Sequence, residues 1–381
     1  MNKVLIIAFC LIGLSSFSVQ AAETVSSEKK AVANLLGGEE EKGADTKQVP
    51  SKTVEDAKDS RGLFSFMNFS FGKEENVAPT QKKEDTLESL TKEADEGNIN
   101  SQITLGYLYL YGNDKVQPNY EKSFQYYGLA AEQGDRVAVN NLGILYYSGI
   151  GTERNVGKAA LQFEKAVQLG NNEAAVNLAF IYLTGTGGVV KNYPRAMELF
   201  SIAAQSNNSV AEFMLGYAYY RGFVYDKNLI EAFNLMKKSA SAQYDDAQYI
   251  LGKMYLQGDG TTKNYGQAVK NFSLAAEQGN VNAMMDLGDI LVAGTVYNKN
   301  LYKAHILFNV ASVRGAEKAA QKRDLLETAL KIEEFLQAQA EAEAFSEKPS
   351  ELTAYIRKTY GTDIKSYIDA AIPANNRQIR K

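Results

Sequence analysis

The chain has 381 residues, of which 45% are hydrophobic and 23% charged, and its net charge is −4. The length suits one large or two ordinary domains, and the composition is typical of a soluble globular protein. The small net charge excludes a strong general attraction to nucleic acid or to an anionic membrane surface.

Residues 1–21 have the pattern of a secretory signal peptide. The positively charged start MNK precedes the apolar run VLIIAFCLIGL, and Val19 and Ala21 are the small residues of a cleavage site. The apolar run is too short for a comfortable membrane span. We expect cleavage after Ala21, with a short retained anchor as the alternative. The only cysteine, Cys10, lies in this segment, so the exported chain would have no disulfide and no thiol chemistry.

Residues 22–84 are predicted to be a disordered linker. They are rich in Lys, Glu, Ser and Thr and show neither helical nor strand periodicity. One island, GLFSFMNFSFG at residues 62–72, carries four phenylalanines. This island is either an unstructured stretch or a short docking segment.

From residue 85 the sequence repeats with a period of 36 or 37 residues. The phrase AVNNLGILYYSG returns in six copies that share one small residue, at Gly106, Gly143, Ala179, Gly216, Gly252 and Gly288. A second phrase, such as AMELFSIAAQSNN, alternates with the first and repeats small and apolar residues at i, i+4, i+7 and i+8. This spacing marks one face of an α-helix. Each unit is therefore predicted to be two antiparallel helices.

Polar and small residues are predicted to delimit these helices. The second helices are expected to end at Gly134, Gly170, Gly279 and Gly315. They are expected to begin at N-cap asparagines, which are Asn119, Asn155, Asn192, Asn228, Asn264 and Asn300. A single helix pair cannot bury its apolar face, whereas stacked pairs bury a continuous core. We explain Gly143 by a close crossing against the alanines of its partner helix.

The segments around the repeats are predicted to cap the array. Residues 86–98 match only a second helix and would form an N-terminal cap. We assign residues 85–315 to the array and 316–346 to C-terminal capping helices, in which a short coiled coil is a weak signal. Residues 347–381 are predicted to hold two short amphipathic helices and a basic tail.

The alternation A-x-x-x-L-G-x-x-Y-x-x-G and A-x-x-x-F-x-x-A-A-x-x-G-N, with the words AAEQGD and AAEQGN, resembles the Sel-one-like repeat (SLR). This is a tetratricopeptide-type helical repeat, and the resemblance covers roughly residues 85–315. It implies an all-α, right-handed superhelical solenoid that serves protein–protein interaction without catalysis. Secreted bacterial members of the family include envelope scaffolds, regulators and host-interaction factors. Some of these carry a disulfide in each repeat, which this chain cannot form, so enzymatic roles proposed for them do not transfer.

No constellation of catalytic or metal-binding residues stands out in the sequence. The only histidine, His305, lies in a second helix, and no Cys, His and carboxylate cluster has metal spacing. We therefore expect no cofactor, no metal and no enzymatic activity. The alternative is a peptidoglycan-active or peptidoglycan-binding envelope enzyme whose carboxylates are hidden among ordinary Glu and Asp residues.

The resemblance implies that the first helix of each pair forms a concave wall. The positions of this wall are rich in Tyr and Phe, which are frequent in binding hot spots. The predicted partner-binding residues are Ile103, Tyr107, Tyr111, Asn140, Ile144, Tyr147, Phe180, Phe213, Tyr217, Tyr220 and Tyr249. For several of these rings, packing between neighbouring repeats is the alternative.

The expected partner is a protein of the bacterial cell envelope, or a host protein if the chain is exported. We expect no nucleic-acid partner and no transmembrane segment in the mature chain. The expected location is the periplasm or the exterior, with association to the outer membrane as one option. The sequence leaves the oligomeric state open.

Overall fold

The computed structural model describes residues 87–372, which form helices joined by short turns and contain no strand. The predicted signal peptide, the linker at 22–84 with its Phe-rich island, and the basic tail lie outside the described residues. Among the residues that are described, no helix combines the length and the apolar character that crossing a membrane requires.

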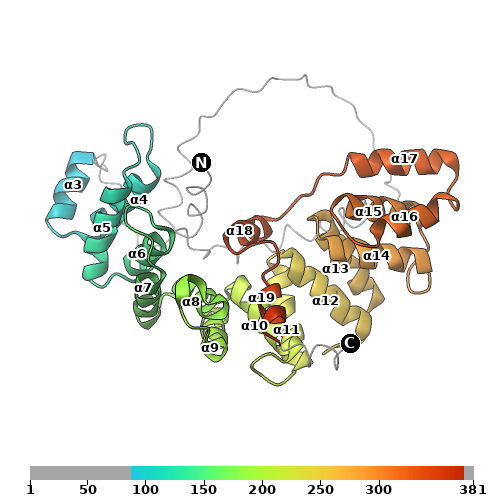
Figure 1. Ribbon diagram of the computed structural model, residues 1–381, viewed down its shortest axis with the longest axis horizontal. Coiled ribbons are helices and arrows are strands. Elements are labelled where there is room, and N and C mark those ends of the chain that lie inside the picture. The colour runs from blue at the N-terminus through green and yellow to red at the C-terminus, as the bar shows by residue number, and fades with distance from the viewer. Residues whose placement is uncertain (1–86, 373–381) are drawn as a thin grey trace, which may run out of the picture.

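Six helix pairs follow α3 (Leu87–Asp95) along the chain. They are α4 (Ile99–Tyr111) with α5 (Tyr120–Glu132), α6 (Arg136–Ser148) with α7 (Val156–Gln168), α8 (Asn172–Thr184) with α9 (Tyr193–Ala204), α10 (Ser209–Arg221) with α11 (Leu229–Ser241), α12 (Asp245–Gln257) with α13 (Tyr265–Glu277), and α14 (Val281–Ala293) with α15 (Leu301–Val313). Each helix packs on the next, and Figure 1 shows the pairs following one another along an arc. The predicted all-α solenoid of helical hairpins is confirmed.

The predicted caps delimit the second helices. The side chain of Asn119 accepts a hydrogen bond from the backbone N–H of Lys122 at 2.9 Å, and the five equivalent asparagines cap their helices in the same way. The predicted closing glycines have φ between 82° and 90°, the left-handed conformation that glycine adopts at low cost. Asn207 and Gln243 take this conformation after α9 and α11. Both sets of sequence-predicted caps are therefore confirmed.

In the five first helices that have an internal glycine, which are all except α8 with Ala179, this glycine lies against a large side chain of the second helix. A β-carbon on Gly143 would lie 2.7 Å from the ring of Phe163, and one on Gly252 would lie 2.7 Å from the ring of Phe272. The predicted close crossing is present, but the predicted partner was wrong, because an aromatic ring and not an alanine lies over Gly143. The rings of Phe163 and Phe272 are buried as a result.

Four further helices follow the last pair. They are α16 (Ala319–Glu327), α17 (Ile332–Glu343), α18 (Glu351–Thr359) and α19 (Ser366–Ala371). Helices α16 and α17 pack against α15 at the end of the array. The chain then runs without helical structure from residue 345 to 350. Figure 1 shows that α18 and α19 turn back and lie inside the arc, beside α10 and α12.

Candidate functional site

The first helices α4, α6, α8, α10, α12 and α14 share a face that we call the inner surface. It comprises the residues two, five and six positions after the leucine of each Leu-Gly pair, together with the starts of these helices. Tyr107, Ile144, Phe180 and Tyr217 occupy the same place in successive repeats, two residues after that leucine or its equivalent. Because the repeats stack in order, these side chains follow one another along the surface.

The predicted partner-binding residues differ in exposure. Tyr147 is 37% exposed, whereas Tyr107 and Tyr111 are half-buried and their ring centroids lie 4.6 Å apart. Ile103 and Tyr220 are also half-buried. The other six are buried, namely Asn140, Ile144, Phe180, Phe213, Tyr217 and Tyr249. A role in partner binding remains a prediction for all eleven.

Phe213 has no surface to offer a partner. Its ring is 0% exposed and meets the ring of Tyr244 edge-on, with centroids 4.9 Å apart. Packing between neighbouring repeats, the alternative that the sequence left open, describes this residue. We leave Phe213 out of the candidate site for that reason.

The C-terminal segment, which we define as residues 350–372, covers the inner surface over α8, α10 and α12. Its strongest charge contacts are with two carboxylates at the start of α12. Nη2 of Arg357 lies 2.8 Å from Oδ2 of Asp245, and Nζ of Lys365 lies 2.9 Å from Oδ1 of Asp246. Both aspartates are only 4% exposed. Burial raises the pKa of Asp246, and the charge of Lys365 opposes that rise.

Aromatic contacts hold the middle of the C-terminal segment. The ring of Tyr360 stacks on that of Phe180, with centroids 4.3 Å apart and planes 21° apart. Tyr367 meets the same ring edge-on at 6.2 Å. Phe180, one of the predicted partner-binding residues, is therefore covered by aromatic side chains of its own chain.

The end of the C-terminal segment contacts α10 through polar groups. The hydroxyl of Tyr217 donates a hydrogen bond to Asp369 at 3.0 Å, and Arg221 forms an ion pair with the same carboxylate. Burial is the main reason why the pKa of Tyr217 is raised. Apolar side chains of the segment complete the contact, since five of them are buried: Leu352, Ile356, Ile364, Ile368 and Ile372.

The fifth repeat differs from the others in its N-cap and in the first two residues of α12, where the C-terminal segment binds. Five first helices begin with a side-chain N-cap, from Asn98, Asp135, Asn171, Asn208 or Asn280. The N-cap residue of α12 is Tyr244, whose side chain makes no such hydrogen bond. Only this repeat has two adjacent acidic residues at the next two positions. This departure was visible in the sequence and was the signal that could have located the contact.

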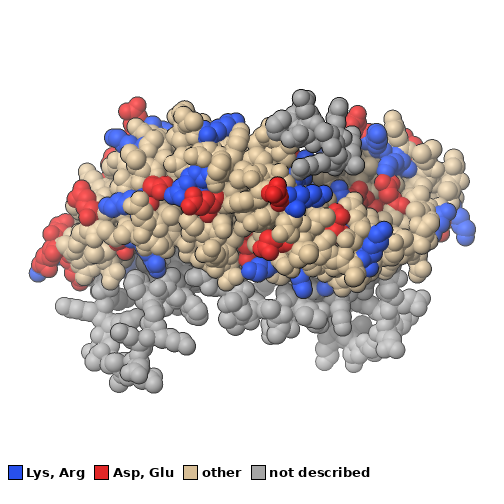
Figure 2. Space-filling view, turned by 90° about the horizontal axis from the view of Figure 1, so that it is seen from below, with Lys and Arg blue, Asp and Glu red and all other residues tan. Residues whose placement is uncertain are grey.

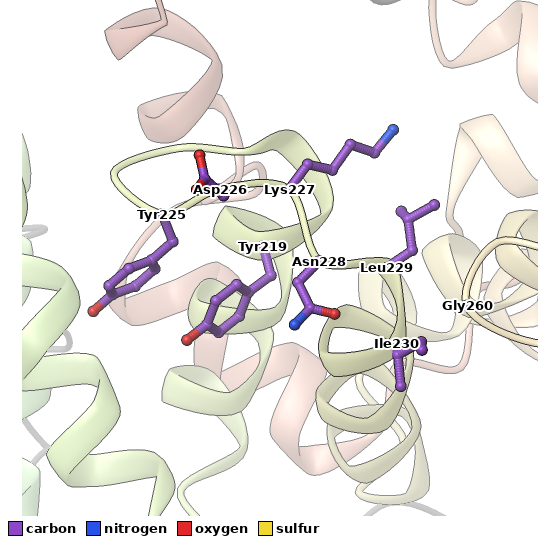
Figure 3. A pocket seen from close by; sticks show the side chains of 8 residues that line it. All are labelled: Tyr219, Tyr225, Asp226, Lys227, Asn228, Leu229, Ile230 and Gly260. Carbon is purple, nitrogen blue, oxygen red and sulfur yellow. The ribbon is translucent and has the colours of Figure 1, made fainter.

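A pocket lies between α10 and α11. It is formed by the turn between α10 and α11 together with Gly260 of the next repeat (Figure 3). The rings of Tyr219 and Tyr225 stack along one side, with centroids 4.9 Å apart. In the same turn Val224 has a φ of 63°, and the N–H of Tyr225 bonds to the carbonyl of Phe223 at 2.7 Å. This γ-turn is strained for a β-branched residue.

Charged groups on the array do not gather by sign on the face drawn in Figure 2, where Lys, Arg, Asp and Glu side chains are interspersed. Within residues 87–372, no group of three His, Cys, Asp or Glu side chains is placed to hold a metal ion. His305 is fully buried, and its ring packs edge-on against Phe335 of α17 with centroids 5.4 Å apart. We therefore take the inner surface, which binds the C-terminal segment through aromatic, ionic and aliphatic contacts, as the candidate functional site.

A family model for the Sel1 repeat matches residues 99–135, 137–171, 172–208, 209–244 and 245–280. Residues 99–280 of this chain therefore consist of Sel1 repeats. The five matched repeats correspond to the helix pairs from α4 to α13, and the Sel1-type pairing continues through α14 and α15. Sel1 repeat proteins are generally non-catalytic scaffolds for protein–protein interaction.

Solved structures of Sel1 repeat proteins resemble this chain. A protective antigen present in uropathogenic Escherichia coli strains, which displays an SLR fold, is 25% identical with a TM-score of 0.50, covering 75% of this chain and 66% of that one. A Sel1 repeat protein from Oxalobacter formigenes is 27% identical with a TM-score of 0.49, covering 61% of this chain and 90% of that one.

A curated relative matches over a shorter stretch. DAP3-binding cell death enhancer 1 from Rattus norvegicus is 34% identical over 77 residues, which are 20% of this chain and 14% of that protein. The match thus spans a small part of that relative.

Proposed function

We propose that this Sel1 repeat protein is a non-catalytic scaffold that binds a peptide segment of a protein partner on its inner surface. The observation that carries the proposal is the C-terminal segment itself. Over α8, α10 and α12 this surface holds a peptide through stacked aromatic rings, ion pairs and buried aliphatic side chains. A surface with such contacts has the chemistry that peptide recognition requires.

The proposed partner site lies over α4 and α6, which precede the contacts of the C-terminal segment along the described part of the inner surface. Tyr107, Tyr111 and Tyr147 present ring surface there, and Tyr107 occupies the same repeat position as Phe180. Tyrosine rings bury a large area at a low cost in side-chain entropy, which makes them effective binding residues. We propose that a partner segment contacts these three rings.

We propose a location in the periplasm or outside the cell. The support is the signal-peptide pattern of residues 1–21, in which a charged start, an apolar run and small residues before Ala22 follow one another. Amino-terminal sequencing of the exported protein tests this. A mature chain beginning near Ala22 is expected, and a cytoplasmic chain that retains Met1 would contradict the proposal.

A second candidate function is an exported factor that contacts a host protein through the same surface. The observation that favours it is the likeness to the protective antigen of uropathogenic E. coli strains. The two candidates differ in the source of the partner and not in the surface that binds it.

Site-specific photo-crosslinking tests the proposed surface. A photoreactive phenylalanine analogue replaces Tyr147 on α6 in one variant and Leu161 on α7 of the same repeat in the other. Leu161 is the control because its side chain is 70% exposed but lies on the second helix. We expect a defined protein adduct at position 147 and none at position 161.

The same experiment includes the double change Tyr107→Ala and Tyr111→Ala. Both rings are half-buried on the surface of α4, so their loss should leave the helical circular dichroism signal intact. We expect the adduct at position 147 to fall about tenfold, because two aromatic anchors are removed. Equal adducts at positions 147 and 161, or an adduct unaffected by the double change, would contradict the proposal.

A further inference from the structure

We propose that the C-terminal segment is an exchangeable ligand of the inner surface, held in cis where a partner of the same chemistry binds. This inference rests on the proposed function and specifies it. The partner would be a short amphipathic segment with aliphatic residues, basic side chains for Asp245 and Asp246, an aromatic ring for Phe180 and a carboxylate for Arg221. A partner that extends from the three tyrosines over α4 and α6 onto α8, α10 and α12 requires that the segment leaves.

The segment is attached to the array in the way that a bound peptide would be. It is not a further repeat, because it lies across the first helices instead of stacking after α17 (Figure 1). Residues 345–350, which precede it, have no helical structure. A connection of this kind allows the segment to swing away from the surface without unwinding α17.

The segment depends on the surface for its own structure. Helix α18 has nine residues and α19 has six, and isolated helices this short are not stable in water. The aliphatic side chains that hold them, such as Ile364 and Ile368, are buried only because the array covers them. A segment that folds on docking also unfolds on release, which lowers its net affinity and makes exchange feasible.

The surface beneath the segment is shaped for a ligand and not for the repeat. In α12 the usual side-chain N-cap is replaced by Tyr244, and two carboxylates follow it. Loss of a side-chain N-cap is unfavourable for a helix, and buried carboxylates are unfavourable without partners. Within the array these carboxylates accept hydrogen bonds from the side-chain amide of Asn280. The cations that they contact, on Arg357 and Lys365, both come from the C-terminal segment.

Hydrogen bonds fix the register of the segment against the fourth and fifth repeats. Oγ1 of Thr353 donates to Oε1 of Gln278 at 2.7 Å, and Nη2 of Arg357 donates to the carbonyl oxygen of Gln278 at 2.9 Å. Oγ of Ser350 donates to the carbonyl oxygen of Gln243 at 2.7 Å. These polar contacts specify where the segment lies, so a competing peptide needs comparable donors.

The test measures binding of a fluorescent synthetic peptide of residues 347–372 to the full chain by anisotropy. A loosened chain carries Arg357→Ala, Lys365→Ala and Asp369→Ala, which weaken the tethered segment and leave the inner surface intact. The matched control carries Lys318→Ala, Lys331→Ala and Glu333→Ala, which remove the same charges at exposed positions of the preceding region. Circular dichroism checks that each chain is folded.

The loosened chain should bind the peptide at least about tenfold more tightly than the wild type, because a tethered competitor acts at an effective concentration of about millimolar. The control chain should bind like the wild type. A peptide that itself carries the three changes should bind neither chain. If the triple variant fails to fold, Lys365→Ala alone replaces it, with an expected gain of about threefold.

Equal binding by the loosened, control and wild-type chains would overturn the inference and show that the segment is a permanent part of the fold. Light scattering on the wild type adds a second outcome, since a dimer would mean that the segment is exchanged between two copies and not held in cis. A peptide that does not bind, together with partner adducts at position 147, would overturn this inference and leave the proposed function standing.

Discussion

The inner surface has two regions that share one framework and differ in what covers them. Over α4 and α6, Tyr107, Tyr111 and Tyr147 keep exposed or half-buried rings. Over α8, α10 and α12, the C-terminal segment contacts the inner surface directly, with Tyr360 on Phe180 and Asp369 on Tyr217. The repeat pattern is the same in both regions. The difference therefore comes from residues outside the repeat pattern, on the segment and at the start of α12.

This difference shows how a repeat array acquires a specific site. The Leu-Gly glycine, the ring that lies on it and the asparagine cap recur in both regions and build the solenoid. The acidic pair at Asp245 and Asp246 occurs in one repeat only. Recognition is thus located where the sequence departs from the pattern, whereas stability follows from the residues that obey it.

The largest expected effect comes from a substitution that releases the C-terminal segment from the inner surface and leaves the residues of the repeats unchanged. Ile364→Asp places a carboxylate at a position that is 0% exposed, at a cost of about 3–5 kcal/mol for an unpaired buried charge. We expect the segment to leave the surface and limited proteolysis to cut it much faster, while the unfolding temperature of the array changes little.

The matched control for that change is Ala354→Asp, at an exposed position of α18. It introduces the same side chain into the same segment and should leave its cleavage rate near that of the wild type. Equal acceleration in the two variants would mean that added charge, and not loss of buried contact, controls docking. No acceleration in either would mean that the segment is held by other contacts.

A smaller effect is expected from the glycines of the shared framework. Gly143→Ala on α6 places a β-carbon 2.7 Å from the ring of Phe163. Overpacking costs about 1–3 kcal/mol, which exceeds the gain in helix propensity of about 1 kcal/mol. We expect a net loss of about 1 kcal/mol in the free energy of unfolding, measured by urea denaturation.

The comparison variant is Gly216→Ala on α10, where the ring is replaced by flexible side chains. Its β-carbon would lie 3.0 Å from Cβ of Leu235 and 3.4 Å from Cε of Met236. Methionine adapts easily to a change of shape, and the contact with Leu235 is 0.3 Å longer than the contact between Gly143 and Phe163. We therefore expect a smaller loss than in Gly143→Ala. Equal losses at both glycines would contradict the account in which the ring decides the cost.

The smallest expected effect is a pH dependence of stability that comes from His305. This residue packs against α17 and not against the C-terminal segment. Burial is the main cause that lowers the pKa of His305, which Glu327 and Asp324 oppose and Arg323 reinforces. The folded protein therefore binds a proton less readily than the unfolded chain. The stability that this histidine contributes is present above about pH 6.5 and is lost as the pH falls below that value.

We expect the unfolding temperature of the wild type to fall more between pH 7.5 and pH 5.5 than that of the His305→Leu variant. The cleavage rate of residues 350–372 should stay similar in both over this range, because the segment has its own contacts with the array. If the cleavage rate of residues 350–372 rose in parallel with the fall in unfolding temperature, α17 and the segment would unfold as one unit.

The helices and their caps could be predicted because their determinants are local. An asparagine before a helix, such as Asn155, and a glycine after it act within a few residues. The partner of Gly143 was misassigned because Phe163 and the neighbouring alanines lie on the same face of the second helix, and periodicity alone does not rank them.

The covering of Phe180 could not be predicted from the repeats, because Tyr360 lies 180 residues further along the chain. Amphipathic helices within 350–371 were expected from the sequence. Hydrophobic periodicity does not predict where on the array such a helix binds. Charge complementarity between Asp245 or Asp246 and the basic residues of the segment was the one available signal, and it becomes meaningful only once the repeats have been aligned.

The most direct test of this account is hydrogen–deuterium exchange of the full wild-type chain, with and without a saturating synthetic peptide of residues 347–372. The peptide is made with heavy isotopes, so that mass spectrometry separates it from the tethered segment. We expect the amides of α18 and α19 to exchange faster than those of α10 and α12, and the peptide to accelerate them further by displacing the segment. Exchange in α18 and α19 as slow as in α12, and unchanged by the peptide, would contradict the account.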